Sequence, residues 1–251
     1  MSDLVAAVLA GGEGRRFRPY TELIPKPMVP VGSEERPLLE YIVWWLARHG
    51  VRDLVFLVGY RWRQVAAYFR DGSQWGVRIR YSVDDERYSN TGGALLKAWK
   101  LGLLGSDVVL VWYGDILAPL DVGALLSTHR KSGARATLAV ARGYRVPVGV
   151  ARVEDGRVVE LVEKPMLPIY ATIGILALDP RVLGEAGEVL GSSFDVMGDL
   201  IPWMIRRGMR VQAYIHEGPW YDVGSMERYA KLDEAGLGEF LKAPPLKVES
   251  H

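Results

Sequence analysis

Three short apolar runs dominate the first 115 residues, and each ends at or just before a glycine. They span residues 4–9, 54–58 and 108–113, and a further strand is predicted at residues 77–81. An apolar run without alternation indicates a strand buried on both faces, as in a parallel sheet. Segments with helical spacing separate these strands, at residues 38–48, 61–69 and 91–101, the last with Thr91 as its predicted N-cap. The pattern predicts an α/β fold, a Rossmann-like three-layer sandwich with a mostly parallel central sheet.

The second half of the chain is more mixed. It predicts helices at residues 122–132, 200–207 and 225–235, and strands at residues 136–141, 171–178 and 211–215. Two short runs at residues 150–153 and 158–162 flank an Asp-Gly turn, which predicts a small antiparallel hairpin. We expect one domain over residues 1–236, and a loosely held tail over residues 237–251 because Pro244 and Pro245 interrupt a segment without periodicity.

Composition excludes several classes of protein. The 31 basic and 30 acidic residues leave a net charge of +1, which argues against a nucleic-acid partner. No apolar run reaches the length of a membrane span, and the start of the chain lacks a basic secretory signal, so we expect a cytoplasmic protein without a membrane partner. Cysteine is absent, which excludes disulfides and thiolate metal sites.

Two residue counts concern the source of the protein. The chain has 23 Arg against 8 Lys, one Asn and three Gln. Depletion of Asn, Gln and Cys is typical of proteins adapted to heat. A GC-rich genome also favours Arg, so both explanations stay open.

A glycine-rich loop follows the first apolar run. It reads LAGGEGRRFRP over residues 9–19, and PKPM follows at residues 25–28. Glycines let backbone N–H groups point at a phosphate and let it approach closely, and Arg16 and Lys26 add positive charge. A dinucleotide fingerprint would need a glycine where Phe17 stands, and the Lys-Ser/Thr of a Walker loop is absent. The loop therefore predicts a phosphate site of another kind, the alternative being a structural turn with solvated arginines.

This pattern resembles the opening of the sugar-1-phosphate nucleotidylyltransferases, which reads roughly L-A-G-G-x-G-T-R-L-x-P-L-T and then P-K-P-M. The chain departs from it at Arg15, Phe17 and Tyr20. The resemblance covers about residues 4–235. It indicates mannose- or heptose-1-phosphate guanylyltransferases and glucose-1-phosphate thymidylyl- or uridylyltransferases as relatives, and it implies that Arg16 and Lys26 are the two catalytic positive charges.

Further segments are similar to later motifs of this family. NTGGAL at residues 90–95 is similar to its nucleotide-binding segment, with Asn90 in place of the usual glycine; Asn tolerates positive φ better than most residues. WYGD at residues 112–115 and WYDVG at residues 220–224 are similar to its two metal-binding motifs, and EKP at residues 163–165 is similar to its sugar-binding motif.

The resemblance implies a set of site residues. Asp115 would be catalytic together with Arg16 and Lys26, and Asp115 and Asp222 would hold Mg²⁺, which suits hard carboxylates and phosphate oxygens. We expect the sugar phosphate to bind Gly149, Glu163, Lys164 and Thr172; Thr172 stands where many relatives have Asn. We expect the nucleotide to bind Leu9, Ala10, Gly11, Gly12, Gly14, Asp85, Asn90, Thr91 and Gly92.

The base preference is predicted from the segment before the nucleotide motif. Thymidylyl and uridylyl relatives often carry a Gln there, whereas this chain has SVDDE at residues 82–86. A carboxylate only accepts hydrogen bonds, and guanine offers two adjacent donors. The hypothesis is GTP over UTP and dTTP, with Asp84 or Asp85 reading the base. The alternative is that residues 84–86 only face solvent and backbone groups read the base.

The implied reaction transfers a nucleoside monophosphate from a nucleoside triphosphate to a sugar 1-phosphate, with a mannose- or heptose-type sugar favoured. Two alternatives stay open: a glucose-1-phosphate thymidylyl- or uridylyltransferase, and a non-catalytic relative that binds nucleotide sugar. A dinucleotide oxidoreductase is disfavoured because the second strand ends in Val58 and Gly59 without an acidic ribose ligand. A homo-oligomer is compatible with the sequence, which does not fix the oligomeric state.

Overall fold

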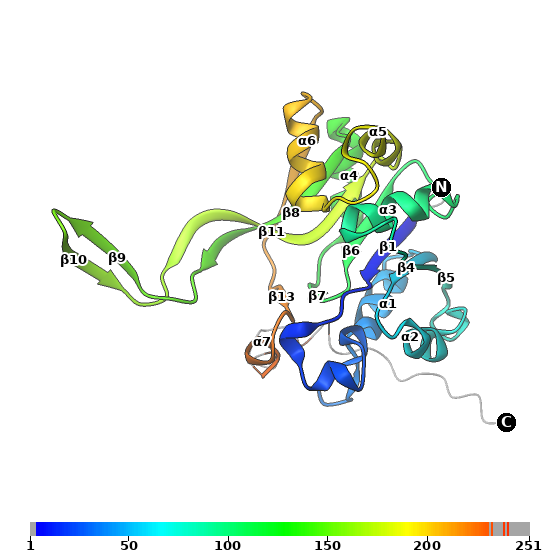
Figure 1. Ribbon diagram of the computed structural model, residues 1–251, viewed down its shortest axis with the longest axis horizontal. Helices are drawn as coiled ribbons and strands as arrows, with labels where there is room; N and C mark the ends of the chain where they lie inside the picture. Colours follow the sequence, from blue (N-terminus) through cyan, green and yellow to red (C-terminus); the bar gives the residue numbers. More distant parts are fainter. Residues whose placement is uncertain (1–3, 231, 233–237, 239, 241–251) are drawn as a thin grey trace.

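The computed structural model describes residues 4–230, 232, 238 and 240 of the chain. Its centre is a seven-stranded sheet with the order β12-β8-β11-β6-β1-β4-β5 (Figure 1). The strands are β1 (Val5–Ala10), β4 (Asp53–Val58), β5 (Arg78–Val83), β6 (Val109–Tyr113), β8 (Ala136–Arg145), β11 (Met166–Leu178) and β12 (Val211–His216).

The sheet is mostly parallel, which confirms the predicted fold class. Strand β1 lies between β4 and β6 in parallel register, so that Val8 faces Phe56 on one side and Trp112 on the other. Only β11 runs antiparallel to its two neighbours, β6 and β8. Because β1 is buried on both faces, its apolar run needs no alternation with polar residues.

Helices cover both faces of the sheet and give two hydrophobic cores. Along β1, Ala6 and Val8 belong to one core while Val5 and Ala7 belong to the other. The first core includes side chains of α1 (Leu38–Arg48), α2 (Trp62–Phe69) and α4 (Val122–Ser132). The second includes side chains of α3 (Asn90–Lys100), α5 (Arg181–Leu190) and α6 (Ile201–Arg206). This arrangement is the predicted three-layer sandwich.

Helix α5 is absent from the sequence-based prediction, and its glycines explain why. Gly184 and Gly187 interrupt the apolar pattern of the helix. A Cβ at Gly184 would lie 2.5 Å from the Trp99 ring, and one at Gly187 would lie 2.8 Å from Leu96. The two glycines therefore let α5 approach α3 closely, a requirement that only the folded structure reveals.

The other predicted helix boundaries agree with the structure to different degrees. Helices α1 and α4 match the predicted residues 38–48 and 122–132. Arg61 precedes α2 with a left-handed φ of 51° instead of starting the helix. A π-helical turn, Val196–Leu200, precedes α6, which ends at Arg206. Thr91 is not the N-cap of α3 but its second residue, since the helix begins at Asn90.

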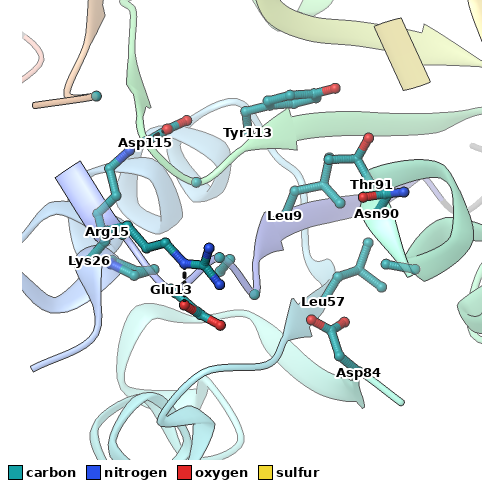
Figure 2. A pocket seen from close by; sticks show the side chains of 18 of the residues that line it. Leu9, Glu13, Arg15, Lys26, Leu57, Asp84, Asn90, Thr91, Tyr113 and Asp115 are labelled. Carbon is teal, nitrogen blue, oxygen red and sulfur yellow. Dashed lines mark hydrogen bonds and ion pairs between the residues drawn. The ribbon is translucent and has the colours of Figure 1, made fainter. Parts of the chain in front are cut away.

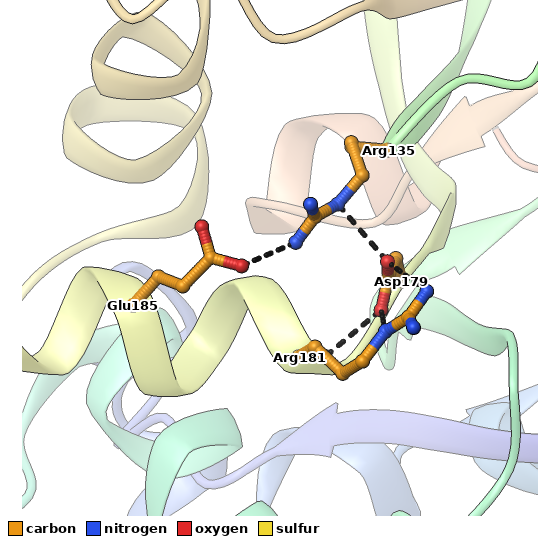
Figure 3. A network of polar contacts seen from close by, with 4 residues as sticks. All are labelled: Arg135, Asp179, Arg181 and Glu185. Carbon is orange, nitrogen blue, oxygen red and sulfur yellow. Dashed lines mark hydrogen bonds and ion pairs between the residues drawn. The ribbon is translucent and has the colours of Figure 1, made fainter.

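A polar network ties the start of α5 to the sheet (Figure 3). Asp179, at the end of β11, accepts hydrogen bonds from Arg181 and pairs with Arg135 at 3.0 Å. Arg135 also reaches Glu185, one turn further along α5. Burial alone would raise the pKa of Asp179, but the hydrogen bonds from Arg181 and the charge of Arg135 lower it below its ordinary value.

Strands β8 and β11 continue beyond the sheet into a long arm (Figure 1). Its tip is the predicted hairpin, formed by β9 (Val150–Glu154) and β10 (Arg157–Val162). The turn residues Asp155 and Gly156 have φ values of 47° and 76°, as a type I′ Asp-Gly turn requires.

The smaller strands are β2 (Pro30–Val31), β3 (Arg36–Pro37), β7 (Ile116–Leu117) and β13 (Tyr221–Asp222). The last described helix, α7 (Met226–Ala230), starts after Ser225, whose Oγ accepts from the backbone N–H of Arg228. Its predicted extension to residue 235 and most of the predicted tail lie outside the described residues. Within that tail Phe240 is described; it is fully buried, with its ring 5.1 Å from that of Trp45. In the described part of the chain, no helix has both the length and the apolar character needed to cross a membrane.

Candidate active site

A cavity of about 620 Å³ opens at the carboxyl ends of β1, β4 and β6 (Figure 2). Open α/β sheets bind ligands at this edge. Ten predicted site residues line it: Leu9, Ala10, Gly11, Gly12, Gly14, Arg16, Lys26, Asn90, Thr91 and Asp115. The other lining residues, which the predicted site set lacks, are Glu13, Arg15, Pro27, Leu57, Asp84, Ala94, Tyr113, Gly114 and Gly224, of which Asp84 is predicted only as a base reader. Leu57 and Tyr113 lie at the carboxyl ends of two predicted buried strands. This position at the strand ends is a signal that could have found them.

The glycine-rich loop presents backbone donors to this cavity. The N–H groups of Gly12, Glu13 and Gly14 make no hydrogen bond with any described residue. Gly14 has a left-handed φ of 62°, and a Cβ there would lie 2.8 Å from Thr21, so a larger residue is excluded. Consecutive free N–H groups in such a turn form a concave site for an anion.

Three basic side chains of the loop region differ in their partners. Arg15 also lines the cavity, but its exposed guanidinium pairs with Glu13 at 2.7 Å. Arg16 lines the cavity, is exposed and has no ion-pair partner in the described chain. Lys26 is largely buried, and its ammonium lies 2.5 Å from Oδ2 of Asp115. Arg16 is thus the basic side chain of the loop that is available to a phosphate without breaking an ion pair.

Backbone hydrogen bonds at the carboxyl edge of the sheet fix the position of Asp115. Gly114, just before it, donates its N–H to the carbonyl of Leu9 at the end of β1, and Asp115 itself accepts from the N–H of Val223. Strands β7 and β13 pair antiparallel, with Asp222 opposite Ile116. Asp115 directly precedes Ile116, so it lies near Asp222, 107 positions away in the sequence; Asp222 itself does not line the cavity, whereas Gly224 does.

This pair fits a magnesium ion that keeps waters and takes phosphate oxygens as further ligands. Both carboxylates are about one-third exposed, and their ion pairs, with Lys26 and Arg228, use Oδ2 of each. No group of three or more His, Asp or Glu side chains that could hold a metal occurs among the described residues. The described donor set at this place is thus the two carboxylates, to which waters and phosphate oxygens would have to add.

The end of the cavity away from Lys26 and Asp115 combines apolar side chains such as Leu57 with the polar side chains of Asp84, Asn90 and Thr91 (Figure 2). Asp84 lies beside Leu57, and its Oδ2 occupies the space that a Cβ at Gly11 or Gly59 would fill. The Asp84 carboxylate accepts no hydrogen bond from the described residues. Burial raises its pKa above the ordinary value, although the charge of Lys97 opposes this.

Asp85 lies outside this cavity, contrary to its predicted role in nucleotide binding. It pairs with Lys97 at 2.8 Å and accepts backbone N–H groups of Arg87 and Tyr88. These contacts hold the pKa of Asp85 below its ordinary value, chiefly through the hydrogen bond from Lys97. Asp85 thus caps a turn, and Asp84 is the residue that faces the ligand space.

The start of α3 behaves in part as expected. Asn90 has a φ of 62°, which confirms that Asn supports the turn in place of glycine. Thr91 donates to Asp195 at 2.7 Å and accepts from the N–H of Val196. Gly92 does not line the cavity: a Cβ there would lie 2.2 Å from the Phe194 ring. Its missing side chain admits the segment that follows α5.

The residues predicted to bind the sugar phosphate do not line the cavity. Thr172 lies in β11, opposite Val140 of β8. The other three gather on the arm: a Cβ at Gly149 would lie 3.0 Å from Oε2 of Glu163, and the ammonium of Lys164 lies 3.7 Å from Oε1 of Glu163. Within a single chain, the glycine-rich loop of the cavity and the Glu163–Lys164 pair of the arm are therefore separated from each other (Figure 1).

Comparison with known families decides to which family the chain belongs. Residues 5–237 match the family described as Nucleotidyl transferase. The chain belongs to this family. Its members among the relatives below act on sugar 1-phosphates, in agreement with the resemblance found in the sequence.

The chain is 31% identical to the UTP–glucose-1-phosphate uridylyltransferase of Synechocystis and to the mannose-1-phosphate guanylyltransferase of Mycobacterium tuberculosis. These alignments cover 94% and 90% of the chain but only 64% and 62% of the two relatives, so the chain spans less than two thirds of their length. It is 32% identical to the D-glycero-alpha-D-manno-heptose 1-phosphate guanylyltransferase of Aneurinibacillus thermoaerophilus, over 91% of the chain and 96% of that relative.

Solved structures share the fold. A putative glucose-1-phosphate thymidylyltransferase from Bacillus anthracis, solved with sucrose, has a TM-score of 0.75 at 23% identity, over 93% of this chain and 95% of that one. HddC from Yersinia pseudotuberculosis, solved with GMP-PN, has a TM-score of 0.69 at 20% identity, over 93% and 99% of the two chains.

Proposed function

We propose that the protein transfers a nucleoside monophosphate from a nucleoside triphosphate to a sugar 1-phosphate and releases pyrophosphate. The observation that carries this proposal is one cavity at the strand ends that combines free N–H groups of residues 12–14 with Arg16, Lys26 and Asp115. Such a set neutralises and positions phosphates. The family and its relatives support the same reaction class.

The chemistry needs positioning and charge neutralisation more than a nucleophilic side chain. An oxygen of the sugar phosphate attacks the α-phosphorus in line, and the bond to the β-phosphate oxygen breaks as pyrophosphate leaves. Arg16 and the loop N–H groups hold the triphosphate and the leaving pyrophosphate. Lys26 stabilises the charge that develops on the transferred group, so its contact counts most in the transition state.

Mg²⁺ fits this scheme as the resident cofactor. Asp115 and Asp222 would hold it between the two phosphates, where it would neutralise phosphate charge when bound. Lys26 and Arg228, which pair with these carboxylates, orient them and partly neutralise them before substrates arrive.

We further propose GTP as the nucleotide. Asp84 is an exposed carboxylate that lines the cavity beside Leu57 and accepts no hydrogen bond from the described residues. N1–H and the exocyclic amine of guanine together supply two donors to one carboxylate. The heptose and mannose guanylyltransferases among the relatives, and the GMP-PN bound to HddC, support this choice. They also favour a mannose- or heptose-type sugar, with Lys164 on its phosphate and Glu163 on its hydroxyls.

The test is a matrix of sugar phosphates against ATP, GTP, UTP and dTTP, read by pyrophosphate release with Mg²⁺. We expect release only when both substrates are present, with GTP best. A tenfold preference for UTP or dTTP would replace the guanylyl assignment by the uridylyl or thymidylyl alternative. Tight binding of nucleotide sugar without turnover in any pair would indicate the non-catalytic relative instead.

A further inference from the structure

The arm leaves an unusual amount of apolar surface open. It comprises residues 142–170, and all eleven residues of β9 and β10 are exposed. Leu161, Val158 and Val153 are 67%, 64% and 58% exposed. A two-stranded ribbon is marginally stable in water by itself, and a contiguous exposed apolar surface marks an interaction site.

The two faces of the hairpin differ in polarity, and this difference predicts which face is covered by a partner. On one face Ala151 lies opposite Leu161 and Val153 lies opposite Val158, so that face is wholly apolar. On the other face Arg152 forms ion pairs with Glu154 and Glu160, and one apolar pair, Val150 opposite Val162, lies at the base of the hairpin. Polar residues on one face and apolar residues on the other are typical of a sheet with one solvated and one packed face. The apolar face is therefore built for burial that the single chain does not supply.

The apolar face leads directly to the predicted sugar-phosphate residues. Gly149 and Glu163 lie next to Leu161, because a Cβ at Gly149 would contact both Glu163 and Leu161. Whatever covers this face is therefore brought against Glu163 and, beside it, Lys164.

The base of the arm, where β8 and β11 leave the central sheet, directs the hairpin away from the cavity of the same chain (Figure 1). Strands β8 and β11 pair from Ala136 and Leu178 out to Arg145 and Met166, and the N–H of Val146 still donates to the carbonyl of Pro165. This ladder continues the central sheet and carries the hairpin clear of the body (Figure 1). Although the ladder has register shifts between Leu167 and Tyr170 and between Thr172 and Leu176, Glu163 and Lys164 do not reach the cavity of their own chain in this structure, and the cavity of a second copy is the site that they could complete.

We propose that two copies of this chain exchange arms, so that each arm packs its apolar face on the other copy and presents Glu163 and Lys164 to that copy's cavity. A two-fold pair makes the exchange reciprocal and closed, which leaves no arm uncovered. This inference rests on the proposed function, because it assigns the sugar-phosphate side of each active site to the second copy.

A crosslinking experiment tests the arrangement without using activity. The chain has no cysteine, so single substitutions give clean labels. Glu163→Cys and Glu13→Cys chains carrying different tags are co-expressed, purified through both tags and treated with a short bismaleimide. We expect a crosslinked dimer. Glu188→Cys, on the exposed face of α5, replaces Glu13→Cys as the control and should give none.

Two results of this experiment would overturn the proposal. One is failure of the differently tagged chains to purify together. The other is a chain carrying both Glu163→Cys and Glu13→Cys that crosslinks within itself at monomer mass, because this would show the arm closed on its own cavity. Both readouts stand even if the enzyme transfers no nucleotide, so failure of the exchange is distinguishable from failure of the proposed function.

Complementation supplies the functional readout. Lys26→Ala removes a group of the body and Lys164→Ala removes a group of the arm. In a mixed pair one site has both defects and the other has neither, so co-expression should restore about a quarter of wild-type activity. Lys26→Ala with Asp115→Asn, both in the body, is the matched control and should restore none. No recovery in the first mixture, or full activity of Lys164→Ala alone, would contradict the exchange.

The apolar face has its own test. Leu161→Asp should convert the dimer to a monomer in sedimentation, because it places a charge in the proposed contact. Glu160→Gln, on the opposite face, should leave the dimer intact. A Leu161→Asp protein that sediments as the wild type does would contradict packing of this face.

Discussion

The ammonium of Lys26 lies 2.5 Å from the carboxylate of Asp115, although 89 positions separate the two residues in the chain. The pair joins the glycine-rich loop region to the end of β6, and it lies in the cavity wall with both side chains mostly buried. In the proposed reaction, Lys26 would thus be held beside the reacting phosphates before they bind. In our account this preorganisation lets it act on charge that develops during transfer.

The first prediction concerns this lysine. Lys26→Ala should lower kcat by roughly 10²–10³, because one well-placed electrostatic stabiliser has about this effect, and should change the KM for the triphosphate much less. Steady-state kinetics over a range of GTP concentrations measures both. A rise in KM at unchanged kcat would reassign Lys26 to ground-state binding.

The second prediction compares two neighbouring arginines. Arg16→Ala should raise the KM for the triphosphate and slow turnover, because its free guanidinium lies in the cavity. Arg15→Ala should have a small effect, because its guanidinium already pairs with Glu13. The same kinetic assay decides, with Arg15→Ala as the matched control. Equal losses in the two variants would refute the distinction.

The third prediction concerns the base. Asp84→Asn should reduce the ratio of kcat/KM for GTP over UTP, because an amide no longer accepts both guanine donors; about 1 kcal/mol is expected, since the side chain is exposed before a base covers it. The ionised form is required, and burial raises the pKa of Asp84. The wild-type KM for GTP should therefore rise as the pH falls through that raised pKa. Asp85→Asn, outside the cavity, is the control, and an unchanged ratio in Asp84→Asn would contradict base reading.

The fourth prediction concerns the metal. Chelation should abolish turnover and added Mg²⁺ should restore it. Asp222→Asn should cost roughly 10²–10³ in kcat even at high Mg²⁺, whereas Arg228→Gln should cost less, because Arg228 only pairs with that carboxylate. Titration of activity with Mg²⁺ measures all three. Wild-type turnover by Asp222→Asn in excess Mg²⁺ would remove Asp222 from the metal site.

The fifth prediction concerns stability. Asp179→Asn should lower the free energy of unfolding by about 1–3 kcal/mol, less than a fully buried pair would lose because Arg181 is largely exposed. The folded pKa of Asp179 is depressed, so its contribution is present above the unfolded pKa and is lost as the pH falls through the folded value. Denaturant unfolding at neutral and acidic pH measures this. The control is Glu185→Gln, at the exposed end of the network, which should change the free energy of unfolding little. An Asp179→Asn protein as stable as the wild type would contradict the stabilising role of Asp179.

The sequence predicts those parts of the fold and site that local patterns encode. The apolar run of residues 4–9 and the glycines behind it place the loop at the carboxyl end of a buried strand, and the structure has it there. Asn90 is a similar case, since its tolerance of positive φ is a property of the residue itself.

Long-range packing accounts for what the sequence does not predict. Gly92 resembles part of a nucleotide motif, yet Phe194, more than 100 positions away, determines why no side chain fits there. Asp84 and Asp85 look alike in the sequence, and only Lys97 on α3 draws one of them away from the cavity. Alternation in β9 and β10 indicates one packed face but not the body against which it packs.

The most direct test of the central claim follows the α-phosphate. The wild-type enzyme is supplied with GTP labelled at the α-phosphorus, Mg²⁺ and a mannose- or heptose-type 1-phosphate, and the products are separated. We predict that the label appears in the nucleotide sugar, with one pyrophosphate released per labelled product and none without the sugar phosphate. Label recovered as free GMP, or pyrophosphate released without the sugar phosphate, would contradict nucleotidyl transfer as the function of this cavity.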